Sequence, residues 1–299
     1  MSKENLEKEY SELGFSNKFM FGKIMRDERR AKPFLEEILS FPIHHIEYIE
    51  REKDVDVNVD SHGMRMDIYV DDGHTIYDCE MQTQNKGDLR KRSRYYQGQI
   101  DTYNLDPGED YNLLKKTYVI FICTFDLFGE ERYIYTFESR CEQNPDLKLG
   151  DESVKVFVNT KGTVGDVSDT FKELLHFIDT SEIKDYDSEL VNDLKDALVD
   201  ARKRTDWRGY YMTMKEYLTE ATREARAEAI TEGRAEGREQ GRAEGRAEGR
   251  AEGKAEALDR YVKRSIKNGV DRGIIISDIM EDYDLSREAA EEKVRKCCV

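Results

Sequence analysis

A β-hairpin is the local structure that this sequence predicts most firmly. Two runs that alternate apolar and polar residues, 63–70 and 75–83, lie on either side of Asp72-Gly73. Asp-Gly between alternating runs is a strong signal of a two-residue turn joining antiparallel strands. With this turn, Arg65 is expected to face Glu80 and Asp67 to face Asp78, because the residue numbers of each cross-strand pair in a hairpin have the same sum.

The predicted hairpin has one apolar face and one polar face, because side chains alternate along a strand and the turn is even. The apolar face, which we expect to contact a core, carries Met64, Met66, Ile68, Val70, Thr75, Tyr77, Cys79 and Met81. The polar face carries Arg65, Asp67, Tyr69, Asp78, Glu80 and Gln82. Like charges on neighbouring strands destabilise a sheet, so a cation should compensate the carboxylates.

The polar face has two interpretations. Exposed faces of antiparallel sheets are usually polar, and the pattern alone favours this solvated interpretation. The other is the wall of a metal site, because Mg²⁺ takes one or two carboxylates and keeps several waters. In that case Asp67 and Glu80 bind Mg²⁺, and Gln82 orients the attacking water or the scissile phosphate.

A basic helix is expected directly after the hairpin. Residues 89–105 have a helical pattern that opens with Arg90, Lys91, Arg92 and Arg94 and ends before Pro107-Gly108. Arginine is suited to bidentate phosphate contacts. Acids beside a basic helix are what a phosphodiesterase needs: a metal at the scissile phosphate and cations on its neighbours. A solvated helix face is the alternative.

The remaining pattern predicts an α/β sandwich with a mixed sheet. This part of the chain is expected to end near residue 182. Residues 118–123 form the longest apolar run, which has the length of a buried strand. The other expected elements are a helix at 16–41 capped by Ser16 or Asn17, a first strand within 44–59, and strands at 118–125, 133–138 and 155–160.

The second part of the chain is expected to be helical and of low complexity. A four-residue Glu-Gly-Arg-Ala unit recurs, with glycines at 233, 237, 241, 245, 249 and 253. Each interior glycine costs roughly 1 kcal/mol relative to alanine, and like charges stack at i,i+4, so the repeat is a marginal helix by itself. It is either an oligomerising or spacer helix or a solvated linker.

The predicted organisation has four parts. They are an α/β domain at 1–185, a helical extension at 186–230, the repeat at 231–257 and a small helical region at 258–299. The last region should contain two or three short helices, the last one starting at Ser286. A DNA-reading helix-turn-helix there is a weaker alternative, because a recognition helix is usually less acidic than this one.

Composition limits the cellular setting and the partners. The net charge of −16 argues against attraction of the whole protein to DNA, although it allows a local basic groove. The cysteine count of five is odd and contains no Cys-x-x-Cys pair, which favours reduced thiols in the cytoplasm. The N-terminus does not resemble a signal peptide, and no run of about 18 apolar residues predicts a membrane span.

Several motifs taken in order resemble one family. They are FMFG at 19–22, GMRMDIYV at 63–70, YDCEMQ at 77–82, RSRYYQ at 92–97, YVIFICTF at 118–125 and YIYTFE at 133–138. Residues 13–180 thereby resemble the recombination-promoting nucleases and transposases of the Rpn family, within the PD-(D/E)XK nuclease superfamily. The resemblance implies a central mixed sheet flanked by helices and Mg²⁺-dependent cleavage of DNA.

The resemblance also implies site residues. By position, Asp67 and Glu80 are the metal ligands, and Gln82 replaces the lysine of the superfamily. Glutamine can only orient a partner by hydrogen bonds. The DNA-binding residues expected from the basic helix are Arg90, Arg92, Arg94 and Gln97. A second departure is Lys18, which stands where relatives usually have an acid before Phe-x-Phe.

Two functions follow from the sequence. The first is a Mg²⁺-dependent DNA endonuclease that acts in recombination or on mobile DNA, with Asp67, Glu80 and Gln82 as catalytic residues. The second is a catalytically weakened nuclease fold that binds DNA or assembles into a homo-oligomer through the repeat. Lys18, Gln82 and the acidic net charge favour the second.

Overall fold

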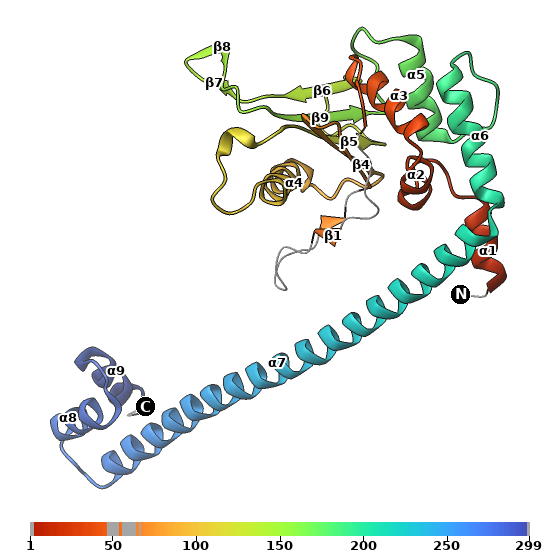
Figure 1. Ribbon diagram of the computed structural model, residues 1–299. Coiled ribbons are helices and arrows are strands. Elements are labelled where there is room, and N and C mark those ends of the chain that lie inside the picture. The colour runs from red at the N-terminus through yellow and green to blue at the C-terminus, as the bar shows by residue number, and fades with distance from the viewer. Residues whose placement is uncertain (1–2, 47–53, 56–63, 66, 298–299) are drawn as a thin grey trace. The chain divides into compact units, whose positions relative to one another are not determined.

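The computed structural model describes residues 3–46, 54–55, 64–65 and 67–297 (Figure 1). The chain divides into two compact units, Met1–Lys215 and Glu216–Val299. The first unit carries the mixed α/β fold that the sequence predicts, and the second is helical. The first expected strand, at 44–59, lies largely outside the described residues, of which only Asp54–Val55 is a strand there.

The first unit is built on a mixed five-stranded sheet in the order β3-β4-β5-β9-β6. Its strands are β3 (Ile68–Asp71), β4 (Thr75–Gln82), β5 (Lys116–Cys123), β6 (Ile134–Phe137) and β9 (Ser153–Asn159). The edge pairs β3–β4 and β6–β9 are antiparallel, whereas β4–β5 and β5–β9 are parallel. Two small antiparallel pairs lie outside this sheet: β1 (Asp54–Val55) with β2 (Met64–Arg65), and β7 (Arg140–Cys141) with β8 (Asn144–Lys148).

Helices cover both faces of the sheet (Figure 1). One face packs against α2 (Lys18–Ile24), α3 (Glu28–Leu39), α5 (Asp169–Thr180) and α6 (Glu189–Lys203), and the other against α4 (Leu89–Asn104). The unit also contains α1 (Lys3–Ser11), the 3₁₀ turn η1 (Tyr111–Leu113) and the first part of α7 (Thr205–Lys267). Figure 1 shows α4 apart from the group of α3, α5 and α6.

The single helix predicted over 16–41 is wrong, because the chain forms α2 and α3 instead. Asn17 caps α2, as the sequence allowed, and its side chain accepts hydrogen bonds from Phe19 N and Met20 N. Asp27 starts the second helix in the same way, with its carboxylate accepting from Arg29 N. A second capping residue inside an apolar-periodic stretch therefore divides it into two helices.

The hairpin exists, but its predicted register is wrong by two residues. Asp71 pairs with Ile76, and Tyr69 pairs with Asp78. The turn is centred on Gly73 and His74, because Asp72 N donates to Thr75 O. Since a shift of two keeps every side chain on its predicted face, the apolar set from Ile68 to Met81 still contacts the main core.

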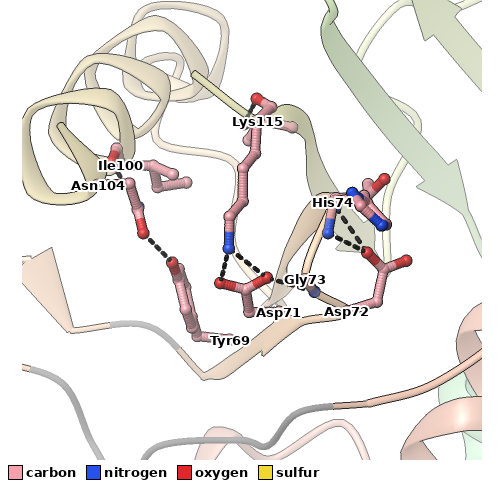
Figure 2. Close-up of polar contacts among 10 residues, drawn as sticks. Tyr69, Asp71, Asp72, Gly73, His74, Ile100, Asn104 and Lys115 are labelled. Carbon is pink, nitrogen blue, oxygen red and sulfur yellow. Dashed lines mark hydrogen bonds and ion pairs between the residues drawn. The ribbon is translucent and has the colours of Figure 1, made fainter. Parts of the chain in front are cut away.

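Side chains at the tip of the hairpin explain this register (Figure 2). The Asp72 carboxylate accepts from His74 N and Thr75 N, and the Asp71 carboxylate accepts from Gly73 N and from Lys115 Nζ. Gly73 adopts a φ of 89°, a region that favours glycine. These local bonds fix the turn one residue later than the Asp-Gly rule predicts.

The corrected register changes the cross-strand partners of the predicted acids. Asp67 does not face Asp78, which pairs with Tyr69 instead. Arg65 does not face Glu80, because it pairs with Asp54 in the separate β1–β2 ribbon. Asp67 comes opposite Glu80, so the two expected metal ligands lie together.

Helix α6 completes the core of the first unit. Ser188 caps it, with its hydroxyl accepting from Val191 N, and Leu194 and Leu198 are fully buried. The helix packs against α2, α3 and α5. Tyr10 OH donates to Ala201 O at its C-terminal end, which ties the N-terminal helix α1 to it.

The second unit contains the repeat and the predicted short helices. The repeat lies within α7, and the side chains of residues 216–256 are exposed. Helices α8 (Arg272–Tyr283) and α9 (Arg287–Cys297) form a small core with the end of α7. Ser286 begins the last helix, as predicted, by accepting from Ala289 N. Within the described part of the chain, every helix is too short or too polar to cross a membrane.

Candidate active site

Asp67, the residue before β3, lies beside Glu80, which is near the end of β4. Asp67 N donates to Glu80 Oε1 over 2.9 Å, and Met81 N donates to Asp67 Oδ2 over 3.0 Å. Each carboxylate is therefore held by a backbone group of the other strand. This reciprocal arrangement brings together the two residues that the sequence assigns as metal ligands.

Lys18, at the first position of α2, contacts both carboxylates. Its Nζ lies 3.6 Å from Asp67 Oδ2 and 3.4 Å from Glu80 Oε2. The Glu80 side chain is 0% exposed and that of Asp67 is 11% exposed, whereas that of Lys18 is 51% exposed. The sequence identified Lys18 only as a departure from the family pattern, and no local signal indicated this contact.

The polar face of the hairpin is buried, so the solvated interpretation is wrong. Asp78 and Glu80 are 0% exposed and Gln82 is 5% exposed. This face lies in the layer where α4 packs on the sheet through residues such as Leu89, Tyr96 and Ile100. Alternation reports which side chains share a face, but not whether a helix covers that face.

Gln82 and Arg92 extend the site toward α4. Arg92 Nη1 donates to Gln82 Oε1 over 3.3 Å, and Nη2 donates to Tyr96 OH over 2.8 Å. The Arg92 guanidinium also lies over the Tyr96 ring, 5.3 Å from its centroid. Within the described residues, Gln82 Nε2 has no hydrogen-bond partner although it is buried. Its N–H groups are therefore available to a ligand.

Two of the other expected DNA-binding residues, Arg90 and Gln97, have hydrogen-bond partners other than the two expected metal ligands. Arg90 Nη2 donates to Leu127 O over 3.1 Å, and Gln97 Nε2 donates to Asp101 Oδ1 over 2.9 Å. Arg90 and Arg94 are exposed on α4. The structure thus links Arg92 directly to the candidate catalytic residues and leaves Arg90 and Arg94 on the helix surface.

Burial dominates the electrostatics of the acids. It raises the pKa of Glu80 to about 8, assisted by the negative charge of Asp67 and opposed by Lys18 and the Asp67 N–H. Burial also raises the pKa of Asp78 well above its usual range, and the charges of Glu80 and Asp67 act in the same direction. Neither carboxylate oxygen of Asp78 has a hydrogen-bond partner among the described residues.

Asp67 and Glu80, called the acid pair below, fit a divalent cation. Asp67 Oδ2 and Glu80 Oε2 already converge on one positive charge, and hard oxygen ligands are those that Mg²⁺ prefers. In the described ranges, no group of three or more His, Cys, Asp or Glu side chains could hold a metal ion. A Mg²⁺ ion here would have two protein carboxylates and complete its coordination with water.

The mixed five-stranded sheet with helices on both faces is consistent with a PD-(D/E)XK nuclease-like fold. Residues 13–145 match the family model of the PD-(D/E)XK nuclease family transposase. This match confirms the resemblance found in the motifs and covers Lys18, the acid pair and α4. It identifies a domain of nuclease or transposase type. No curated protein and no solved structure matches the chain.

Asp78→Asn is expected to stabilise the chain more at about pH 8 than at about pH 5. The pKa of Asp78 is higher in the folded chain than in the unfolded chain, so the folded state binds its proton more tightly. The stability that this proton contributes is fully present below pH 3.8, the ordinary pKa of an aspartate. It is lost as the pH rises toward the pKa of Asp78 in the folded chain. Asparagine removes this dependence.

Urea unfolding of both proteins at the two pH values measures the effect. We expect the increase in the free energy of unfolding caused by Asp78→Asn to be larger at about pH 8 than at about pH 5. The difference should be roughly 1–3 kcal/mol, the usual penalty for an unpaired buried polar group. The groups whose charges act on Asp78 are Glu80, Asp67, Lys18 and Arg92, and they are the same in both proteins. An equal gain at the two pH values would contradict the prediction.

Proposed function

We propose that this protein is a Mg²⁺-dependent DNA endonuclease associated with recombination or mobile DNA. The observation that carries the proposal is the convergence of Asp67 Oδ2 and Glu80 Oε2 on one cation position. Two carboxylates on an antiparallel strand pair, within a matched nuclease-family domain, are a suitable site for a metal that acts on a phosphodiester.

Each residue of the site has a separate role in the proposed reaction. A bound divalent cation supplies stabilisation of developing charge on the phosphate and a water that ionises more easily. Asp67 and Glu80 hold that cation. Gln82 is fixed through its oxygen by Arg92, so its free N–H groups can orient the attacking water or a phosphate oxygen. Arg92 adds a positive charge beside Gln82.

DNA binding is assigned to the N-terminal half of α4. Arg90 and Arg94 are exposed there, Arg92 reaches the site, and Gln97 lies one turn further along. Arginine side chains can neutralise phosphates locally although the chain has a net charge of −16. The helix therefore provides cations near the acid pair, where the phosphate backbone would lie.

A second candidate is a weakened nuclease fold that binds DNA or assembles into a homo-oligomer. The contact of Lys18 with both acids favours it, because an ammonium group stands between the two expected metal ligands. The exposed residues 216–256 of α7 are the segment that would mediate assembly. The free thiols of Cys79, Cys123, Cys141 and Cys297 support a reducing compartment such as the cytoplasm.

Cleavage of supercoiled plasmid by the purified full-length protein tests the proposed activity. We expect nicking or linearisation with Mg²⁺ or Mn²⁺, none in EDTA, and none by the Asp67→Ala/Glu80→Ala double variant. Equal cleavage by the double variant would defeat the assignment of the site. Binding of DNA without cleavage by either protein would favour the second candidate.

A further inference from the structure

We propose that Lys18 is a built-in counter-ion of the acid pair, which fills the cation position and must be displaced before a divalent metal binds. The inference rests on the metal site of the proposed function and adds its regulation. Lys18 belongs to α2, which packs against β4, so its position is set by the tertiary fold.

The atoms that contact Lys18 are those that a metal would use. Glu80 Oε1 accepts from Asp67 N, which leaves Glu80 Oε2 directed at Lys18 Nζ over 3.4 Å. Asp67 Oδ2 also faces Lys18 Nζ, over 3.6 Å. Mg²⁺ binds oxygen at about 2.0–2.1 Å, so an ammonium group between these two oxygens and a metal ion exclude each other.

Charge balance explains why a cation resides there. The Glu80 side chain is fully buried, and an unpaired buried charge is strongly destabilising. Lys18 compensates the pair without a metal. Among the described residues, Arg92 is a second cation whose charge acts on this region, and it is held by Gln82 and Tyr96 instead. The acid pair is therefore neutralised in part by a residue that is not a ligand.

Exchange requires only a movement of the side chain. The backbone at Lys18 is fixed by the Asn17 cap of α2. The Lys18 side chain is 51% exposed and ends a flexible four-carbon stem, so the ammonium group can move into water without disturbing the helix. Metal binding thus competes with an internal ion pair, which lowers the affinity for the metal.

Calorimetric titration of the full-length protein with Mg²⁺ tests this competition. Lys18→Met and Lys18→Gln remove the competing charge, and we expect each to bind Mg²⁺ about tenfold more tightly, equivalent to about 1.4 kcal/mol. Lys18→Arg keeps the charge and is expected to bind no more tightly than the wild type. Lys32→Met is the matched control, because Lys32 pairs with Glu36 within α3.

A second measurement uses the wild type and needs no substitution. Saturating Mg²⁺ should increase the rate at which an amine-acetylating reagent modifies Lys18, detected by mass spectrometry, and leave Lys32 unchanged. Thermal unfolding adds a third readout: without metal the two neutral variants should melt below the wild type, and Mg²⁺ should raise their Tm more.

The outcomes separate the inference from the proposed activity. Equal or weaker Mg²⁺ binding by the neutral variants, including no measurable binding, overturns the inference, as does an unchanged reactivity of Lys18. Tighter binding by the neutral variants together with no plasmid cleavage by any protein upholds the counter-ion and refutes the nuclease activity. Cleavage by the wild type without tighter Mg²⁺ binding by the neutral variants supports the nuclease activity and overturns the role of Lys18 as a counter-ion.

Discussion

Glu80→Gln is expected to lower Mg²⁺-dependent DNA cleavage about a thousandfold, because losing the metal removes several kcal/mol of charge stabilisation. Glutamine keeps the size of the side chain and its oxygen still accepts from Asp67 N, so the strand pair should remain intact. Asp67→Asn should have the same effect. The first-order rate of plasmid nicking with enzyme in excess measures the loss.

Asp78→Asn is the matched control for this loss. Asp78 lies two residues before Glu80 on the same strand and is equally buried, but its carboxylate contacts neither Lys18 nor Asp67 among the described hydrogen bonds and ion pairs. We expect its cleavage rate to change by less than about tenfold, in line with a residue that does not touch the metal. If Asp78→Asn and Glu80→Gln reduce cleavage equally, the metal ligands are assigned wrongly.

A chain that ends at Lys215 is expected to fold, whereas one that ends at Asp185 is not. The shorter chain lacks α6, which buries Val191, Leu194 and Leu198 against the main core. Burial of each such side chain contributes roughly 1.5–3 kcal/mol. Because a domain is stable by only about 5–15 kcal/mol in total, losing all three removes most of the stability.

Circular dichroism and urea unfolding of the two shortened chains measure this difference. A point substitution in the full chain isolates the packing of α6: Leu194→Ala should lower the free energy of unfolding by roughly 2–5 kcal/mol. Leu218→Ala is its control, because Leu218 is 54% exposed and should change the free energy by less than about 0.5 kcal/mol. Cooperative unfolding of the 185-residue chain with undiminished stability would contradict the prediction.

The hairpin shows how far local sequence patterns reach. Alternation and an Asp-Gly pair predict two strands and the correct face for every described side chain. The predicted register is wrong because the side chains of Asp71 and Asp72 accept hydrogen bonds from backbone N–H groups of the turn, and Asp71 also pairs with Lys115 of another segment. A turn rule that counts only the central pair does not contain these bonds.

The alternating pattern could not predict that a helix covers the polar face of the hairpin. A period of two is the same for a solvated strand and for a strand under a helix. The sequence predicts a helix over 89–105, and the structure has α4 there. The placement of α4 over Asp78, Glu80 and Gln82 comes from the βαβ connection between β4 and β5. Burial of these side chains, and the raised pKa of Glu80 that follows, are tertiary effects.

The sequence by itself determined the class of the domain, the two hairpin strands, the helix over 89–105 and the residues Asp67, Glu80 and Gln82 as candidates, because short-range periodicity and the order of motifs are local properties. The tertiary structure alone decided that Asp67 stands opposite Glu80 and that Lys18 contacts both. Lys18 reaches them because α2 packs on β4, a contact between distant segments that no local pattern encodes.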